Sequence, residues 1–402
     1  MTPVFVVLNA GSSSLKFQVF EARDEGQPCM VFKGLFEGLG GPAHFVVKGT
    51  DGAILDEMTW SAGDKLGHEE ALMHLVTWLR QHQEDRKLVA IGHRVVHGGE
   101  AFSRPVLVDE AVLQSLETLV PLAPLHQPHN LEPIRIVRRR IPGMPQVACF
   151  DTAFHQGQSD IATMFALPRE MRERGVRRYG FHGLSYDYIA SVLKDYDPKL
   201  AKGRVVVAHL GNGASLCALK DGASVATTMG FSALDGLPMG TRCGALDAAV
   251  VFYMLREMKL SPEQAERMLY TKSGLLGVSG LSNDMRTLRS KAATDSDAKS
   301  AIDLFVYRIV REIGSLMAAL GGIDGLVFTA GIGENDVATR AEVIAGLNWA
   351  GFALDEAANQ AGGRQISSGA GPTAWIIPTN EELVIARQTQ GVLGAASARI
   401  AS

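Results

Sequence analysis

The sequence predicts an α/β protein of two similar half-domains that face each other across a cleft. The main observation is a repeat: VFVVLNAGSSSLKFQVF at 4–20 resembles RVVVAHLGNGASLCALKDG from Arg204, and Ser14-Leu15 matches Ser215-Leu216, 201 residues further along. Helix and strand patterns alternate between the two copies, as expected for an α/β fold. A chain of 402 residues also exceeds one hydrophobic core. Chance similarity of two glycine-rich hairpins is the alternative to a duplication.

Composition and charge argue against several classes of protein. The chain has 46% hydrophobic and 20% charged residues, and its net charge of −4 is too mild to indicate a nucleic-acid partner. It has no run of about 18 apolar residues that would span a membrane, and its first residues lack the pattern of an export signal. The four cysteines are Cys29, Cys149, Cys217 and Cys243, and they form no C-x-x-C pair. Isolated thiols of this kind favour a reducing cytoplasm over a framework of disulfides or zinc.

The first copy of the repeat predicts a hairpin that can cradle phosphate. Residues 4–8 and 15–20 read as two strands, and the loop between them, Asn9 to Ser14, contains only small residues. Such a loop lets an anion approach the backbone N–H groups. Lys16 follows as a point charge for phosphate oxygens. An ordinary glycine-serine hairpin is the alternative interpretation.

Hydrophobic periodicity and end signals predict the elements that come next. The expected helices are 68–83, a helix capped by Asn130 that runs through Arg140, a helix starting near Asp247, and 296–320, which Gly321-Gly322 ends. The expected strands are 88–96, 146–150 and the apolar start of GLVFTAGIGEN, which runs into a second glycine loop.

Polar residues near the ends of the predicted strands are candidates for chemistry. His93 and His97 look like a metal pair, but four residues of strand span about 13 Å, too far for one zinc ion. Arg94 is a charge within an otherwise apolar strand. Asp151 ends the strand 146–150, where a carboxylate reaches the carboxyl edge of a sheet. Capping of the following helix is its alternative role.

Loop residues supply a second group of candidates. Arg177, Arg178, His182 and Arg242 stand beside glycines in loops, where arginines suit phosphate binding better than fold building. A surface salt bridge is the alternative for each of these arginines. The histidines of PLAPLHQPHN, at positions 126 and 129, fit a proline-rich surface loop without a further role.

The motifs that carry these residues resemble the acetate kinases. LNAGSSSLKF, HRVVHGGE, FDTAFH, GFHGLSY, HLGNGASL, MGTRCGALD, SNDMR, GIGEN and TNEE occur in the order of that family and span the chain. The resemblance implies the acetate and sugar kinase, Hsc70 and actin superfamily fold, with ribonuclease-H-like domains at 1–151 plus 383–402 and at 152–382. It also implies reversible phosphoryl transfer between ATP and acetate, giving ADP and acetyl phosphate. Mg²⁺, with Mn²⁺ as a substitute, would be the cofactor, and the enzyme would be a homodimer.

Residue by residue, the resemblance also implies roles. Asn9 and Glu381 would lie on the magnesium side, and Arg94 would hold the acetate carboxylate. Asp151 would be the essential carboxylate, while His182 and Arg242 would stabilise the transferring phosphoryl group. The acyl pocket would consist of Val96, Leu125, Phe181 and Ala233. The nucleotide would contact Lys16, then His209, Leu210, Gly211, Asn212 and Gly213, and finally Asp284, Met285, Arg286, Gly331, Ile332, Gly333, Glu334 and Asn335.

One departure from the family pattern bears on the substrate. Where acetate kinases commonly read D-T-S-M-G-F-T-P-L-E-G, this chain has ATTMGFSALDG at 226–236, so Ala233 replaces the proline. The change leaves open a kinase of the same fold that acts on propionate or butyrate. A second alternative, from another class, is an ATP-hydrolysing binding module like actin or the heat-shock proteins.

The residue inventory suits transfer to a carboxylate. With a pKa of about 4 to 5, the acceptor is already ionised at neutral pH and needs no strong base. The difficulty is bringing an anion against a polyanion, which arginines, an imidazole and a magnesium ion would relieve. We expect direct in-line transfer, and the sequence leaves a carboxylate intermediate open.

Overall fold

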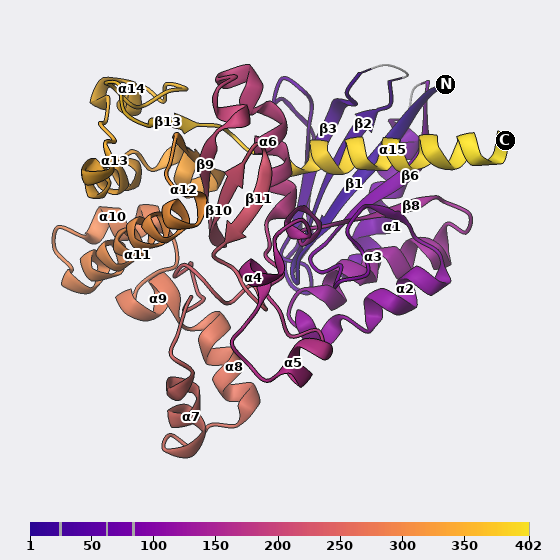
Figure 1. Cartoon of the computed structure of the whole chain (residues 1–402). Helices are drawn as coiled ribbons and strands as arrows, with labels where there is room; N and C mark the ends of the chain where they lie inside the picture. Colours follow the sequence, from indigo (N-terminus) through magenta and orange to yellow (C-terminus); the bar gives the residue numbers. More distant parts are fainter. Residues whose placement is uncertain (24–25, 62, 83–84, 402) are drawn as a thin grey trace. The chain divides into compact units, whose positions relative to one another are not determined.

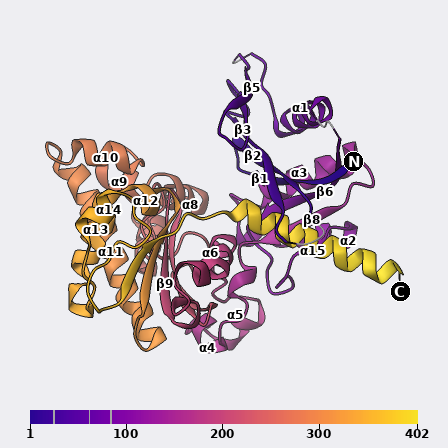
Figure 2. The same ribbon diagram turned by 90° about the horizontal axis from the view of Figure 1, so that it is seen from above.

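The computed structural model describes residues 1–23, 26–61, 63–82 and 85–401, and the chain divides into two compact units. Unit 1 contains Met1–Ala153 together with Asn380–Ser402, and unit 2 contains Phe154–Thr379. Figures 1 and 2 show the whole chain, coloured along the sequence. Each unit has its own sheet.

The sheet of unit 1 has the strand order β5-β4-β3-β2-β1-β6-β8-β7. Its strands β1 to β3 are antiparallel neighbours, whereas β6 pairs parallel to β1 and β8 pairs parallel to β6. The bounds are β1 Thr2–Ala10, β2 Ser14–Glu21, β3 Cys29–Glu37, β4 His44–Lys48, β5 Ile54–Thr59, β6 Arg86–Val95, β7 Val106–Leu107 and β8 Gln146–Phe150. The predicted strand 146–150 is confirmed, and the predicted strand 88–96 corresponds to β6.

Helices pack against this sheet through apolar side chains. A core of aromatic and aliphatic residues, among them Phe17, Phe36 and Phe45, joins the strands to α1. The C-terminal helix α15 packs across β1, β6 and β8 (Figure 1). The helices are α1 His68–Gln81, α2 Glu110–Glu117, η1 Val120–Leu122, α3 Gln127–Arg140 and α15 Glu381–Ala401. The predicted helix 68–83 is thus confirmed as α1, although Gln83 lies outside the described residues.

Unit 2 repeats the topology of unit 1. Its sheet has the order β11-β10-β9-β12-β13, with β9 to β11 antiparallel and with β12 and β13 added in parallel, which matches β3-β2-β1-β6-β8. The bounds are β9 Arg204–Leu210, β10 Ala214–Lys220, β11 Ala223–Thr227, β12 Gly325–Thr329 and β13 Thr373–Ile376. The prediction of an α/β fold with two similar halves is therefore confirmed, because the two units share the order and directions of five strands.

Helices α6 and α11 pack on the sheet of unit 2. α11 contacts β9, β10 and β11, while apolar residues of α6, including Tyr186 and Ile189, pack against β9, β10 and β12 (Figure 2). The helices are α4 Asp160–Thr163, α5 Arg169–Glu173, α6 Gly183–Tyr196, α7 Ala248–Arg256, α8 Pro262–Thr271, α9 Gly274–Ser279, α10 Met285–Lys291, α11 Ser296–Leu320, α12 Ala330–Asn335, α13 Val337–Gly346 and α14 Glu356–Gln360, with short 3₁₀ turns η2 Ala153–His155, η3 Leu200–Lys202 and η4 Asn348–Ala350. The predicted helices at 296–320 and after Asp247 are confirmed.

Two local predictions are wrong. Asn130 does not cap α3, because that helix begins at Gln127 with a proline in its first turn. GIGEN is not a loop: strand β12 ends at Thr329 and helix α12 begins at the next residue. Within the described part of the chain, no helix is long and apolar enough to cross a membrane.

Candidate functional site

The first predicted hairpin forms one wall of a hollow in unit 1. Three residues connect β1 to β2, and the Gly11 N–H donates to the Ser14 carbonyl at 2.9 Å. The hollow has a volume of about 330 Å³. It brings residues of the predicted site together with His126, His129 and Asn130, for which the sequence predicted no role in a site. The lining residues are Asn9, Ala10, Gly11, Ser12, Ser13, Ser14, Lys16, Arg94, Val96, Leu125, His126, His129 and Asn130.

Asn130 explains how two strand ends are held beside this hollow. Its amide donates to the Ala10 carbonyl at 2.8 Å and accepts from the Val96 N–H at 2.9 Å, in a buried position. A buried amide with both functions bonded fixes its neighbours in one arrangement. The end of β1 and the residue after β6 are therefore tied to helix α3.

The partly exposed Arg94 and the buried Asp151 form an ion pair in unit 1. The Asp151 carboxylate accepts from Arg94 Nη2 at 2.6 Å and from Nε at 3.2 Å, and Arg94 Nη1 donates to Asn9 Oδ1 at 3.2 Å. Burial lowers the pKa of Arg94, but the carboxylates of Asp151 and Glu381 outweigh this effect and raise it overall. Asp151 thus holds the Arg94 guanidinium, in place of the alternative role of capping the following helix. These bonds use three of the five guanidinium N–H groups.

Glu381 starts α15 and is a second carboxylate near Arg94, partly buried. Burial raises its pKa to about 7; Arg94 and Lys16 lower the pKa, and Asp151 and Glu382 raise it. Asn380 caps the helix, since its Oδ1 accepts from the Leu383 N–H at 3.0 Å. Among the described residues, no group of three or more His, Cys, Asp or Glu side chains is placed to hold a metal ion.

The histidines of unit 1 have different surroundings. His93 is buried with Nε2 2.8 Å from Gln146 Oε1, and burial lowers its pKa to about 4. His126 and His129 line the hollow, although the sequence indicated only a surface loop. Burial and the neighbouring His68 lower the pKa of His129. Nothing in the local sequence around these two residues distinguishes the hollow from solvent.

In unit 2, His182 and Arg242 meet at the tip of the second hairpin. A Cβ atom built on Gly213 would lie 3.2 Å from His182 Nε2 and 3.9 Å from Arg242 Nη1. His182 has a left-handed backbone (φ +57°) at the start of α6, its Nδ1 lies 2.8 Å from Ser215 Oγ, and its ring stacks on that of His209. Left-handed conformations at non-glycine residues concentrate at functional sites.

A second hollow, of about 580 Å³, lies beside that hairpin in unit 2. Eight of the predicted nucleotide residues line it: Gly211, Asn212, Asp284, Met285, Arg286, Gly331, Ile332 and Asn335. The other predicted residues of this unit do not, namely His209, Leu210, Gly213, Gly333 and Glu334. Leu210 is fully buried, and the Glu334 carboxylate accepts from the backbone N–H of Ala330 at 2.7 Å.

Arg289 and Asp336 also line this hollow and were missed by sequence reasoning. Arg289 Nη1 and Nη2 donate to the Glu342 carboxylate at 2.7 and 2.6 Å, and its Nε donates to Asp336 Oδ2 at 3.2 Å. These bonds hold the guanidinium at the wall. Arg289 follows the SNDMR motif by three residues, one turn of α10, which was the available signal.

Two further loop arginines have packing partners. Arg178 Nη1 lies 3.2 Å from Asp235 Oδ2, and its guanidinium stacks over the Phe165 ring. Arg177 Nη2 donates to Thr163 Oγ1 at 3.0 Å. Arg178 therefore forms a salt bridge, which is the alternative to phosphate binding for this arginine.

Residues of the predicted acyl pocket are divided between the units. Val96 and Leu125 line the hollow of unit 1, whereas Phe181 and Ala233 belong to unit 2. Phe181 is buried, and the Ala233 carbonyl accepts from Arg242 Nη1 at 3.0 Å. The joint pocket stays a prediction.

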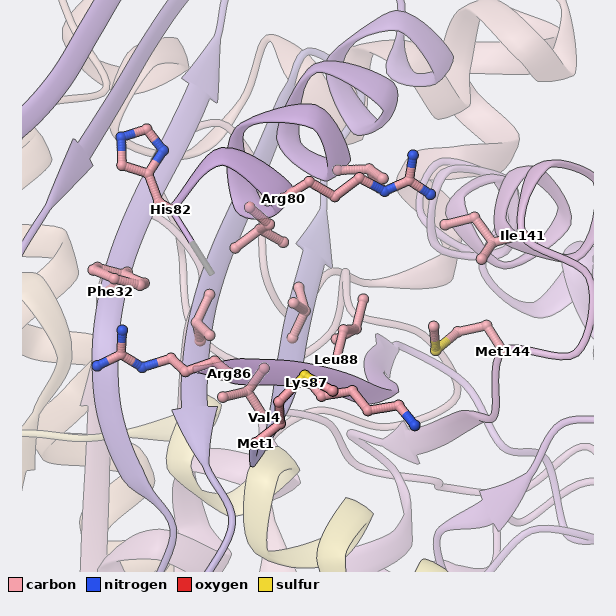
Figure 3. A pocket seen from close by; sticks show the side chains of 14 residues that line it. Met1, Val4, Phe32, Arg80, His82, Arg86, Lys87, Leu88, Ile141 and Met144 are labelled. Carbon is pink, nitrogen blue, oxygen red and sulfur yellow. The ribbon is translucent and has the colours of Figure 1, made fainter. Parts of the chain in front are cut away.

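A third hollow, also in unit 1, shares no residue with the predicted site (Figure 3). Apolar side chains such as Phe32 and Leu88 line it, with Arg80, Arg86 and Lys87 also around it. Arg86 is already engaged, since its Nε lies 2.8 Å from Glu21 Oε1.

A duplicated α/β fold with a glycine hairpin in each half is typical of enzymes that move phosphoryl groups, the phosphotransferases, and similarity to known proteins narrows the class. The Acetokinase family model matches residues 4–387. An acetate kinase from Rhodopseudomonas palustris is 50% identical over 392 residues, 96% of this chain and 98% of that one. One from Rhizobium meliloti is 46% identical, with 98% and 99% covered.

Solved structures give the same result for the fold. The structure of a propionate kinase from Francisella tularensis has a TM-score of 0.90 and 37% identity, with 98% of this chain and 100% of the other covered. That of the Porphyromonas gingivalis acetate kinase has a TM-score of 0.85 and 34% identity, with 97% and 100% covered. The chain belongs to the acetokinase family.

Membership defines the activity. The enzyme is a phosphotransferase with a carboxyl acceptor, and it transfers a phosphoryl group reversibly between ATP and acetate. This finding decides against the ATP-hydrolysing binding module.

Proposed function

We propose that transfer is direct and in line, that it depends on Mg²⁺, and that the hollow of unit 2 holds the nucleotide. The observation that carries this proposal is the meeting of His182, Arg242 and Gly213 at the hairpin beside that hollow. A guanidinium and an imidazole at one end of the site would stabilise charge on the transferring group. Gly211 and Asn212 leave backbone accessible to the phosphates.

On the acceptor side, Arg94 binds the carboxylate of acetate. Its guanidinium is held by Asp151 and Asn9, and N–H groups remain for a ligand in the hollow that it lines. A two-point clamp fixes the orientation of a carboxylate as well as its place. Asp151 thus acts by orienting the arginine.

The residues proposed for magnesium suit the ion. Glu381 is a partly buried carboxylate with its pKa raised to about 7, and a divalent cation would favour its ionised form. Mg²⁺ typically takes one or two carboxylates, water and substrate phosphates, so a cluster of three protein ligands is not required. Glu381 and Asn9 would hold the ion, which would neutralise charge on the phosphates.

A glycine in α12 allows a direct test of the nucleotide hollow. A Cβ built on Gly331 meets no atom within 4 Å, so a side chain there enters open space rather than the core. Gly331→Leu should raise the dissociation constant of ADP at least tenfold in calorimetry while the protein stays folded. The matched control is Gly391→Leu on α15, where a Cβ also meets nothing. Unchanged ADP binding in Gly331→Leu would reject the hollow as the nucleotide site.

We propose acetate as the primary acyl substrate and propionate as the secondary one. Ala233 in place of proline favours a roomier pocket, and the propionate kinase structure shows that the fold is used for the longer acid. Assay of acetate, propionate and butyrate with ATP, Mg²⁺ and hydroxylamine, read as hydroxamate, ranks the acids by kcat/KM. A higher value for propionate would reverse the assignment.

We also propose a homodimer. Helix α7 has the sequence AAVVFYMLR, yet none of its nine residues is buried, and Phe252 and Tyr253 are more than half exposed. Apolar faces of this kind commonly pair with another subunit. Light scattering should give twice the mass of 43.1 kDa, and Phe252→Glu should give monomer. A monomeric parent protein would contradict the proposal.

A further inference from the structure

The junction between β12 and α12 has an unusual backbone. Thr329 ends the strand in an extended conformation and Ala330 begins the helix with φ +65°. Left-handed geometry is unfavourable for a residue with a Cβ and persists where neighbouring bonds impose it. Gly331, Ile332 and Asn335 of this short helix line the hollow proposed for the nucleotide.

The Glu334 carboxylate accepts two backbone hydrogen bonds at this junction. Its Oε1 accepts from the Ala330 N–H at 2.7 Å and from the Thr379 N–H at 3.2 Å. The carboxylate thus does not line the hollow. It binds the backbone N–H of Ala330, the first residue of the helix to which Glu334 itself belongs. Thr379 is the last residue of unit 2, directly before Asn380 and Glu381.

Other buried groups fix both ends of this arrangement. Arg340 is fully buried, and its Nη1 donates to the carbonyls of Gly333 and Glu334 at 3.0 and 2.9 Å. Thr379 Oγ1 accepts from the buried Ser185 hydroxyl at 2.9 Å, and that hydroxyl lies 2.9 Å from His209 Nδ1. The Glu334 carboxylate is therefore the link between the helix and the segment that leads to Glu381.

We propose that Glu334 is a positioning residue for nucleotide binding: it holds the left-handed backbone of Ala330, and so α12, in the arrangement that forms the wall of the hollow. This inference rests on the proposed nucleotide site. It differs from the role expected by resemblance, in which Glu334 touches the nucleotide. Failure of the site itself would appear separately, as unchanged ADP binding in Gly331→Leu.

Glycine at position 330 separates positioning from direct contact. Glu334→Ala removes the acceptor and should raise the ADP dissociation constant and the KM for ATP at least tenfold, with the KM for acetate within twofold. In the double variant Glu334→Ala with Ala330→Gly, the ADP dissociation constant should be at least threefold lower than in Glu334→Ala alone, because glycine adopts φ +65° without strain. Glu356→Ala, at an exposed glutamate of the same unit, is the matched control.

The outcomes are decisive in either direction. A double variant that binds ADP no tighter than Glu334→Ala overturns the proposal, as does a rise in the KM for acetate equal to that for ATP. If Glu334→Ala does not fold, Glu334→Gln replaces it. Its amide oxygen still accepts both N–H bonds, so ADP affinity should stay within threefold of the parent protein, and a tenfold loss would show that the charge acts on the ligand instead.

Discussion

At the scale of single residues, the role of Arg94 depends on the partners that hold it. Asp151 and Asn9 bind three of its N–H groups, and the side chain lines the hollow. Lysine has one ammonium group and cannot keep this geometry. We predict that Arg94→Lys and Arg242→Lys each lose at least about 2 to 4 kcal/mol of transition-state stabilisation, measured from kcat/KM.

The matched control is Arg135→Lys, which changes a half-exposed ion pair with Glu117 in the same unit as Arg94. Exposed pairs of this kind are worth about 1 kcal/mol or less, so its activity should be unchanged. Near-normal turnover in either active-site variant would remove the role assigned to that arginine.

Ala233 carries a prediction about substrate choice. One methylene in an apolar pocket is worth roughly 1 to 3 kcal/mol, so a proline ring at position 233 should discriminate against propionate. Ala233→Pro should lower kcat/KM for propionate more than for acetate, provided that the backbone accepts φ near −65°. A folded variant with an unchanged or higher propionate-to-acetate ratio would show that residue 233 does not line the pocket.

Single residues also show what the sequence could and could not predict. A charge inside the apolar strand at Arg94 and a carboxylate at a strand end at Asp151 are visible one by one, but their pairing depends on two strands meeting in parallel. Arg289 lies outside every motif and reaches the hollow only because α10 turns it there. Burial of this kind comes from tertiary packing, which local patterns do not record.

At the scale of elements, strands and long helices were predictable because their hydrophobic periods are strong. The GIGEN segment was not: two glycines in five residues indicate a loop, whereas bonds from Glu334 and Arg340 stabilise a helix. The two hairpins share a pattern but not a register: the last pair of the first, Ala10 with Leu15, encloses four residues, whereas that of the second, Leu210 with Ala214, encloses three. Tertiary contacts decide both features.

His155, in the turn η2, carries a prediction about how stability depends on pH. His155 Nδ1 lies 2.8 Å from Ser224 Oγ on β11 and its Nε2 lies 3.0 Å from the Phe181 carbonyl, and burial lowers its pKa from 6.5 to about 4. The unfolded chain therefore takes up the proton first, and stability present above pH 6.5 is lost as the pH falls towards 4. The free energy of unfolding should fall by up to about 1.4 kcal/mol per pH unit for this group.

His155→Gln keeps both hydrogen-bonding functions and does not titrate. Urea unfolding of the parent protein and this variant between pH 4 and 7 should show a shallower slope for the variant, whatever its absolute stability. Parallel curves would mean that His155 does not contribute to acid sensitivity.

At the scale of the whole molecule, the repeat detected in the sequence extends to the order of five strands in each unit. The offset of the hairpins predicted the duplication because both copies keep the same buried strands and small loop. The bounds of the two ribonuclease-H-like domains, 1–151 plus 383–402 and 152–382, remain a prediction.

The two units are joined where Ala153 meets Phe154 and where Thr379 meets Asn380. We predict that bound nucleotide and acetate close them, which would exclude water from the reaction. Small-angle scattering with ADP, Mg²⁺, AlF₄⁻ and acetate should give a smaller radius of gyration than the free protein. An unchanged radius would count against closure.

The stereochemistry at phosphorus distinguishes direct transfer between two bound substrates from transfer through a phosphorylated enzyme. ATP made chiral at its γ-phosphorus with three oxygen isotopes is allowed to react with acetate, and the configuration of the acetyl phosphate is determined. A single in-line displacement inverts the configuration. We predict inversion; retention would require a second displacement through a phosphorylated carboxylate of the enzyme and would contradict the mechanism.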